Sequence, residues 1–583
     1  MSRYQEIQDA LNRESPTPVD LPKLYFLGDT GAGKTTIIRK LLGTEESKFP
    51  TTRQTRTTVT PTEYVIRNGD GFDITVVLKP ISEVKSYVDE IVKDAIGKFY
   101  KDRQKEKIVK NIRQTSDQRF RLYYLLSKEF SERVAQKIAD LGPLVEEKVK
   151  ALLKEFPDVQ EETGVFVDLA LSELQTPYDA LLDTIIAEIQ RITAAVCGGK
   201  ELSSEWEVYK HETTSRTDFI AKCKQILSSE ANSLSPVIEH ARIRGELAAP
   251  WLGSATEAVV IDGEGIGHDT KEAGQLDSRH YDFFYGSDAI LLIEESRKPF
   301  VAGGKSALKS IFERGYGDKL IILFTKLDEV EPYDVNDPTD GDRIEEVKDG
   351  LTNVLASLKE EGQEIELDEK RILFLGGLQQ DGVNADAIEQ IKFVFLQSRE
   401  MSVFQPSFVK PEYDFEMLSA FLVESTRKFN ELYQEMLANQ HWKTVEAFNR
   451  RMDMGIDGFR MFTPITDFEE KINEEIKAFI STPISWQQEV RDALKRQSLD
   501  KIRREFNKLI IDFARQEIVK APHTAWNVAY MHSGRGSTVL RKNDIESILK
   551  RSVPPSVSSQ RVKEFKDHVK HLLEKAISNC EKA

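Results

Sequence analysis

The chain of 583 residues has few cysteines, and they lie far apart. Cys197, Cys223 and Cys580 fit neither a disulfide framework nor a zinc site, because both need closely spaced groups of cysteines. No stretch approaches the roughly 18 apolar residues that cross a bilayer, and residues 1–20 lack the apolar core of a signal peptide. These absences predict an intracellular, cytoplasmic protein in a reducing compartment, with no transmembrane segment.

Most of the chain also lacks an excess of positive charge. The net charge is −16, but residues 484–583 carry 20 Lys and Arg against 12 Asp and Glu, a balance of +8 that leaves −24 for the rest. This distribution gives no strong nucleic-acid signal, because binding to phosphate backbones needs an excess of lysine and arginine. The basic segment leaves a peripheral membrane contact open, although the sequence has no apolar tip, lipidation signal or long basic amphipathic helix.

Apolar periodicity divides the chain into five parts. Residues 1–20 form a short N-terminal segment. Short apolar runs, typical of strands buried on both faces, occur in residues 21–82 and again in 251–405. Residues 83–250 and 406–583 instead carry apolar residues at the spacing of amphipathic helices. We predict an α/β domain with a mainly parallel sheet, split by a large helical insertion and followed by a C-terminal all-α region.

The same patterns give more local predictions. "TEYVIRN" and "FDITVVLKP", joined by the turn "GDG", are expected to form a hairpin. Strand signals are absent from about Ser82 to Ala249 and return in "EAVVID", "DAILLIE", "KLIILFT" and "KRILFLG". We expect the two helical regions to be packed bundles rather than separate active sites.

A glycine-rich loop between the first predicted strand and helix carries the strongest motif. In "LYFLGDTGAGKTTIIRK", Gly28 opens and Thr35 closes the P-loop pattern G-x-x-x-x-G-K-[ST]. Glycines let backbone N–H groups surround the β-phosphate, Lys34 reaches the β- and γ-phosphates, and the Thr35 hydroxyl ligates Mg²⁺. The motif predicts a nucleoside triphosphate ligand. The predicted phosphate-binding residues are Gly28, Asp29, Thr30, Gly31, Ala32, Gly33, Lys34, Thr35 and Thr36.

The strand "KLIILFT" ends in a motif that predicts the base. Residues 325–328 read Thr-Lys-Leu-Asp at the carboxyl end of the strand, where α/β sheets bind ligands. The Asp328 carboxylate can accept hydrogen bonds from the ring N–H and the exocyclic amine of guanine, a pair of donors that adenine lacks. Lys326 would cover the base plane with its apolar stem, and Thr325 precedes it. The motif predicts GTP rather than ATP.

A third motif ends the strand "EAVVID". Residues 262–265 read Asp-Gly-Glu-Gly. This segment resembles the D-x-x-G element of the P-loop GTPases, and the resemblance implies that Asp262 holds Mg²⁺ through a water molecule and that the Gly265 N–H donates to the γ-phosphate, where any side chain would obstruct the approach. Although Asp262 lies 228 residues beyond Lys34 in the sequence, we expect the two to be neighbours because the insertion only interrupts the domain.

With these elements in chain order, the sequence resembles the P-loop GTPases over about residues 21–80 and 255–400, with Thr325 replacing the commoner asparagine. Its helical flanks look most like the large, dynamin-type members. The resemblance implies GTP or GDP bound with Mg²⁺, slow hydrolysis, and switch loops that order around the γ-phosphate. It also implies a threonine that completes the Mg²⁺ shell, and "PTTRQTRTTVTPTEYVI" offers Thr58, with Thr57 as the alternative. The implied catalytic residues are Lys34, Thr58 and Gly265, and the implied metal-binding residues are Thr35, Thr58 and Asp262.

Three departures from the family pattern concern catalysis and the base. Ile266 stands where small GTPases keep a glutamine that orients the attacking water, and Glu264 and His268 are the polar candidates nearby. Gly31 removes the side chain by which some large GTPases bind an activating monovalent cation. After "KRILFLG" the usual Ser-Ala-Lys element is replaced by Gly-Gly-Leu at 376–378. We therefore expect hydrolysis to need help from a switch residue, a second protomer or the helical domains, typically worth about 10³- to 10⁵-fold.

One cluster in the C-terminal region is "HTAWNVAYMHSGRGSTVLRKND". It gathers aromatic and basic groups around a glycine loop, and the preferred interpretation is a capped turn between helices. The alternative is a contact for a phosphate-bearing partner, an acidic protein or the GTPase domain itself. The cluster comprises His523, Trp526, Tyr530, His532, Arg535, Arg541 and Lys542.

The sequence leaves three functions open. The first is a molecular switch or mechanochemical large GTPase, whose nucleotide state is coupled to the helical domains and to a GTP-dependent homodimer or a protein partner. The second is a GTP-binding scaffold with little intrinsic hydrolysis, motivated by Ile266. The third is a membrane-associated, dynamin-like remodeller. The basic C-terminal segment is the only sequence feature that supports it.

Overall fold

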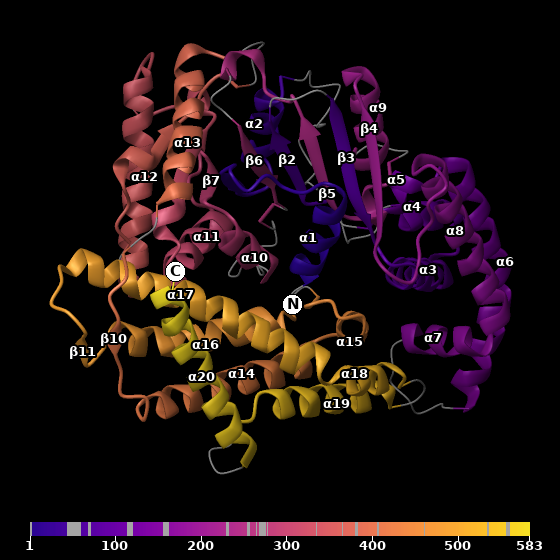
Figure 1. Ribbon diagram of the computed structural model, residues 1–583. Coiled ribbons are helices and arrows are strands. Elements are labelled where there is room, and N and C mark those ends of the chain that lie inside the picture. The colour runs from indigo at the N-terminus through magenta and orange to yellow at the C-terminus, as the bar shows by residue number, and fades with distance from the viewer. Residues whose placement is uncertain are drawn as a thin grey trace. The chain divides into compact units, whose positions relative to one another are not determined.

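The computed structural model describes most of the chain (Figure 1). The described residues are 3–43, 60–67, 71–113, 120–155, 163–228, 233–253, 257–263, 265–266, 276, 278–333, 335–363, 365–378, 383–404, 407–459, 461–532, 536–555 and 560–582.

The chain folds into two compact units. The first unit comprises Met1–Gln5, Asp20–Thr36 and Gly265–Ala583, and the second comprises Glu6–Val19 and Ile37–Glu264. This division joins the helical insertion to the strands that flank it, and so differs from the five parts expected from periodicity. The five-part division stays a prediction.

The first unit contains the strands that carry the P-loop and the base motif. Its strand order is β1-β7-β8-β9, and every neighbouring pair is parallel. Nearly every position in these strands is buried, which explains their continuous apolar runs. The predicted α/β arrangement with parallel strands is confirmed here. The strands are β1 (Lys23–Leu27), β7 (Ala289–Glu295), β8 (Leu320–Thr325) and β9 (Ile372–Phe374), and the helices between and after them are α10 (Ser278–Gly286), α11 (Ala302–Glu313), α12 (Asp340–Glu360) and α13 (Ala385–Val403).

The second unit contains five strands in the order β4-β3-β5-β2-β6. Strand β2 pairs with β5 in parallel and with β6 antiparallel, and β3 pairs antiparallel with both β4 and β5. The predicted hairpin of β2 and β3 is therefore wrong, because β5 lies between them. The strands are β2 (Thr62–Ile66), β3 (Phe72–Leu78), β4 (Glu207–Thr213), β5 (Ile238–Gly245) and β6 (Ala258–Asp262).

Strands β4 and β5 also correct the expectation that residues 83–250 are helical throughout. Strand β5 reads "IEHARIRG" and has no apolar run because it buries charged side chains in pairs. The Arg242 side chain is 0% exposed, and its Nε donates to Glu63 Oε2 of β2 at 2.7 Å. His240 Nε2 lies 3.0 Å from the other oxygen of Glu63. Paired charges can be buried where single ones cannot, so β5 forms in a polar sequence.

Apart from β4 and β5, the described residues of the insertion are mainly helical, as predicted. Helix α3 buries Val84, Val88, Ile91 and Val92 at the expected three-to-four spacing. Helix α1 (Arg3–Glu14) packs Ile7 and Leu11 against Val77 of β3. The helices of the insertion are α3 (Ile81–Asp102), α4 (Lys105–Arg113), α5 (Leu122–Leu125), α6 (Lys128–Glu155), α7 (Thr163–Glu173), α8 (Gln175–Val196) and α9 (Arg216–Leu227).

The C-terminal region of the first unit is almost entirely helical, which confirms that prediction. Aromatic side chains fill its core, where Phe429 meets Phe468 edge-on and Phe448 meets Trp526 edge-on. Among the helices of the described residues, none is both long and apolar enough to cross a membrane. The helices are α14 (Leu418–Asn439), α15 (Trp442–Asp453), α16 (Pro464–Ser481), α17 (Asp492–Ala514), the π-helical turn η6 (Arg515–Lys520), α18 (His523–Tyr530), α19 (Ser537–Ser552) and α20 (Gln560–Lys582), with the short strands β10 (Pro411–Glu412) and β11 (Ser485–Trp486).

Candidate nucleotide site

The segment that carries the P-loop sequence pattern connects β1 to α2 (Lys34–Leu41), and the name P-loop is kept below for this segment. Gly28 follows the strand with φ 155°, and a Cβ on it would lie 2.2 Å from the Ile293 carbonyl oxygen of β7. Gly33 has φ 100°, in the region that L side chains avoid. Glycine is thus required at both ends of the loop, once for close approach of a neighbouring strand and once for backbone conformation.

The Lys34 ammonium lies inside the loop. Its Nζ donates to the carbonyl oxygens of Gly28 and, at 3.0 Å, of Asp29, and the side chain is buried. The helix that begins at Lys34 points its free N–H groups into the same loop, which gives it a positive potential. This arrangement suits an anion with several oxygens.

The base motif lies directly beside the P-loop. The Thr325 hydroxyl at the end of β8 donates to the Ala32 carbonyl oxygen at 2.7 Å, although 293 positions separate the two residues. A Cβ on Gly33 would lie 3.4 Å from the Thr325 side chain, so the contact is close. The structure therefore brings the two strongest sequence motifs of the first unit together.

Asp328 is exposed and held by the element that departs from the family pattern. Its Oδ1 accepts from the Gly377 N–H at 2.7 Å. Lys326 precedes it in the left-handed conformation, with φ 58°, and its ammonium pairs with Glu295 Oε2 at 2.9 Å. The Gly-Gly-Leu sequence thus supplies a backbone donor that fixes the carboxylate. Recognition of guanine by Asp328 stays a prediction.

Glu294 is a residue of this site that the sequence reasoning missed. It lies in β7 next to the P-loop and is 3% exposed. Its Oε2 accepts from the Phe300 N–H at 2.9 Å, and its Oε1 is buried without a hydrogen-bond partner among the described residues. Burial and the nearby Asp29 carboxylate raise the pKa of Glu294 to about 8, against the opposing effects of the Phe300 N–H and Lys34. The sequence signal that could have identified Glu294 is an acidic residue at the end of an otherwise apolar predicted strand.

Helix α11 begins against these two carboxylates. A Cβ on Gly303 would lie 2.2 Å from Asp29 Oδ1, and a Cβ on Gly304 would lie 2.2 Å from Glu294 Oε1. The first turn of a helix carries partial positive charge, so it is a favourable place for carboxyl groups. The two glycines let α11 approach the P-loop side chains closely.

Ile266 is tied to the P-loop. Its N–H donates to the Gly28 carbonyl oxygen at 3.2 Å, and its side chain is 4% exposed. A buried apolar side chain in this position cannot orient water. The polar candidates Glu264 and His268 lie outside the described residues, as do Thr57 and Thr58.

Asp262 is the last residue of β6 in the second unit, where it is buried opposite Thr62 of β2. Thr35 stands in the first turn of α2 and is half-buried. No group of three or more His, Cys, Asp or Glu suited to a metal occurs among the described residues. Mg²⁺ in nucleotide sites commonly uses few protein ligands together with phosphate oxygens. The roles of Thr35, Thr58 and Asp262 at the metal, and of Lys34, Thr58 and Gly265 in catalysis, stay predictions.

Helix α10, which follows the Asp-Gly-Glu-Gly segment, contacts the P-loop strand. The Tyr25 hydroxyl of β1 lies 2.6 Å from His280 Nδ1, and the Tyr25 ring stacks on Phe283 with centroids 4.8 Å apart. These contacts fix one side of α10 against β1.

The other side of α10 contacts the C-terminal helices. Arg515 of η6 forms two hydrogen bonds with Asp282, at 2.8 and 3.1 Å. The Arg314 guanidinium, at the end of α11, lies 4.1 Å from the Tyr281 ring centroid and pairs with buried Glu469 of α16. Burial disfavours its charge, but the Glu469 carboxylate raises the pKa of Arg314 above its ordinary range. Helix α10 therefore joins the P-loop strand to the helical region.

The aromatic and basic cluster at 523–542 is part of the helical core. The Trp526 ring is 0% exposed, and its Nε1 donates to the Ile518 carbonyl oxygen at 2.7 Å. Arg541 donates to the His532 carbonyl oxygen at 2.6 Å, and His532 Nε2 lies 2.6 Å from Asp544 Oδ2. These contacts agree with the preferred interpretation, a capped turn between helices. Arg535 lies outside the described residues.

Comparison with known proteins gives little. No protein-family model matches the chain, and no curated protein matches it either. Two solved structures of an oligomerised bacterial dynamin pair, described as a mechanism for long-range sensing and tethering of membranes, align with 97% of this chain and 86% of their own. Their sequence identities are 7% and 8%, and the TM-score is 0.26 in both cases. A TM-score this low supports no conclusion about fold or function.

Proposed function

We propose that this protein binds GTP with Mg²⁺, hydrolyses it slowly, and transmits its nucleotide state to the helical region. The observation that carries the proposal is the hydrogen bond from Thr325 to the Ala32 carbonyl oxygen. It joins a loop suited to phosphates to a strand end with an exposed carboxylate at Asp328. One ligand with a triphosphate and a guanine base accounts for both features.

Each residue of the proposed site has a chemical role. Lys34 would exchange the carbonyl oxygens that it now contacts for β- and γ-phosphate oxygens. Thr35, with Asp262 and a threonine such as Thr58, would hold Mg²⁺, which supplies charge neutralisation for phosphoryl transfer. The Gly265 N–H would donate to the γ-phosphate.

Helix α10 supports the proposed coupling. It follows the segment that would contact the γ-phosphate, and it contacts both β1 and the C-terminal helices. A shift of that segment would therefore move Asp282 relative to Arg515, which is the kind of discrete rearrangement that switches use. GTP-dependent self-association, or binding of another protein, would supply the missing catalytic help.

A second candidate is a GTP-binding scaffold with little turnover. The specific observation in its favour is Ile266, which is buried and bonded to Gly28 at the position where water would be oriented. Membrane remodelling stays an alternative without a supporting contact in the described residues.

Base preference is the first test. Fluorescent GTP, ATP and XTP would be titrated against the wild type, Asp328→Asn and Lys34→Ala, with the exposed Asp337→Asn as the matched control. We expect the wild type to prefer GTP, Asp328→Asn to shift towards XTP, Asp337→Asn to behave as wild type, and Lys34→Ala to lose triphosphate binding. A wild type that prefers ATP would overturn the proposal.

Turnover and assembly separate the candidates. Phosphate release faster than about one per minute from the pure protein would exclude the scaffold, since intrinsic GTPase rates range from roughly 10⁻⁴ to 10⁻² per second. Gel filtration with GDP, GTP and a transition-state mimic tests self-association. If the protein elutes as the same monomer in all three states, GTP-dependent self-association is excluded.

A further inference from the structure

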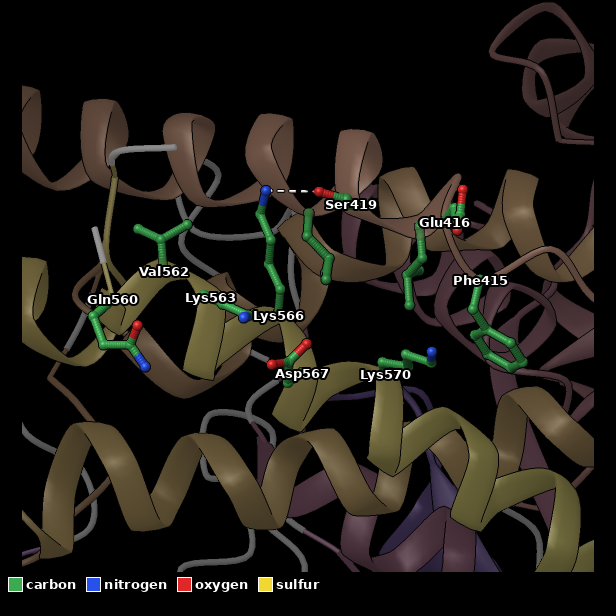
Figure 2. A pocket seen from close by; sticks show the side chains of 11 residues that line it. Phe415, Glu416, Ser419, Gln560, Val562, Lys563, Lys566, Asp567 and Lys570 are labelled. Carbon is green, nitrogen blue, oxygen red and sulfur yellow. Dashed lines mark hydrogen bonds between the residues drawn. The ribbon is translucent and has the colours of Figure 1, made fainter. Parts of the chain in front are cut away.

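A recess lies between two helices of the C-terminal region, and none of its lining residues belongs to the P-loop (Figure 2). It has a volume of about 500 Å³ and is formed by the start of α14 and the first half of α20. The Leu418, Leu422 and Val562 side chains that line it are buried, so they form an apolar floor. Phe415 lines the same recess just before α14.

Three lysines of α20 line the recess. Lys563, Lys566 and Lys570 are spaced three and four residues apart, and side chains at this spacing share one face of a helix. Helix geometry places the first and last about 10 Å apart along the axis. The Lys566 ammonium donates to the Ser419 hydroxyl at 2.7 Å, across the recess, and Lys570 lies 5.4 Å from the Phe415 ring centroid (Figure 2).

The three lysines outnumber the carboxylates of the recess lining by one. Glu416 and Asp567 also line the recess, but neither forms an ion pair with a lysine within the described part of the chain. A third carboxylate, Glu574, lies outside the lining, and its Oε1 is 4.0 Å from the Lys570 ammonium. Lys566 contacts a neutral hydroxyl instead. Lys563 and Lys566, which form no ion pair in the described part of the chain, share a concave surface, and ammonium groups placed in this way attract anions.

The apolar floor and the three lysines together restrict the chemical class of the ligand. Lysine ammonium groups bind phosphate oxygens as point charges, and three in a row favour a group with more than one negative charge. An apolar floor adds affinity for a ligand that also has an apolar body, and the volume lies within the usual range for small-molecule sites. A fully apolar ligand would leave the lysines unused, and an inorganic anion would leave the floor unused.

The geometry points to a binding site for an organic diphosphate, with the diphosphate on Lys563, Lys566 and Lys570 and its apolar part on the half-buried Phe415 ring, above the buried floor. This site is independent of the proposed GTP site. The same chemistry occurs in soluble isoprenoid diphosphates and in anionic lipid headgroups.

Calorimetry with geranyl diphosphate tests the site. We expect binding to the wild type at least tenfold tighter than that of inorganic pyrophosphate, and none of geraniol. The double variant Lys563→Gln/Lys566→Gln should lose binding at least tenfold. The matched control, Lys575→Gln/Lys582→Gln, removes the same charge from exposed positions of the same helix and should bind as wild type.

The outcomes are distinct. Equal loss in both double variants would show general electrostatic attraction and would overturn the site, as would equal affinity for pyrophosphate and geranyl diphosphate. Flotation with phosphatidylcholine vesicles containing phosphatidic acid distinguishes the source. Lysine-dependent flotation without soluble binding would assign the phosphate to a lipid, and absence of both would overturn the site. Circular dichroism checks that each variant is folded.

Discussion

Gly304 and Glu294 approach so closely that a Cβ on the glycine would lie 2.2 Å from Glu294 Oε1. The contact joins the first turn of α11 to the strand beside the P-loop, and nothing in either local sequence requires it. Substitutions in the first turn of α11 should therefore alter nucleotide binding at the P-loop.

Gly304→Ala should destabilise the protein and weaken GTP binding. The added methyl must displace the buried carboxyl group, and such overpacking typically costs about 1–3 kcal/mol. Chemical denaturation and a fluorescent GTP titration measure the two effects. Gly341→Ala, in the first turn of α12 with only ordinary contacts, is the matched control and should be neutral or slightly stabilising. The cost should shrink in a Glu294→Ala background, and an undiminished cost there would contradict the contact.

Glu294 should make stability depend on pH. Its pKa is about 8 in the folded protein, against an ordinary value of 4.5. The folded chain therefore binds one more proton than the unfolded chain between these values, and its stabilisation is lost as the pH rises from 4.5 towards 8, by up to about 1.4 kcal/mol per unit. Asp29 and Lys34 are the charged groups that face it, and they act in opposite directions.

Denaturant unfolding at several pH values between about 5.5 and 8.5 measures this slope. Glu294→Gln should flatten it relative to the wild type, because the amide does not titrate. Burial also raises the pKa of Asp467 to about 7, but that contribution is the same in both proteins and cancels. Identical slopes would show that Glu294 is ionised in the folded state.

Arg314→Met should destabilise the protein by about 3–5 kcal/mol, because it leaves the buried Glu469 carboxylate without its partner. Glu469→Leu in the same chain should recover part of the loss, since a paired apolar replacement removes both charges. The exposed pair of Arg427 with Glu424 is the control, and Arg427→Met should leave stability unchanged within error. Urea denaturation compares the variants. A small effect of Arg314→Met alone would mean that the pair is solvated.

Thr325→Val should weaken GTP binding about five- to thirtyfold. It removes the hydroxyl that donates to the Ala32 carbonyl oxygen while keeping the side-chain shape, and leaving that buried acceptor unpaired costs about 1–2 kcal/mol. Thr325→Ser keeps the hydroxyl and should bind nearly as the wild type. If both variants bind alike, the hydroxyl does not position the P-loop.

The sequence predicted the parts of the fold whose signals are local. The strands of the first unit were found because each is a short buried apolar run, and the P-loop because its glycines are dictated by backbone geometry. Strand β5 was missed because Arg242 is buried through its partner Glu63, which lies far away in the sequence. Charge compensation of this kind has no local pattern.

In the candidate site, too, the residues with a local motif were predicted, and those that depend on packing were not. Thr325 was predicted for the base, but its bond to Ala32 depends on the packing of β8 beside the P-loop. Glu294 was missed since an acid at a strand end is usually solvated, and only the approach of α11 makes it buried.

Trp526 has a consequence for how the protein can be observed. Its indole is fully enclosed against Phe448, in the helical region rather than at the P-loop. A tryptophan in such surroundings fluoresces at shorter wavelength than one in water. The chain thus carries an optical reporter in the part that would read the nucleotide. Because the chain has five tryptophans, emission spectra with and without GTP would be compared between the wild type and Trp526→Phe to isolate rearrangement there without any attached dye.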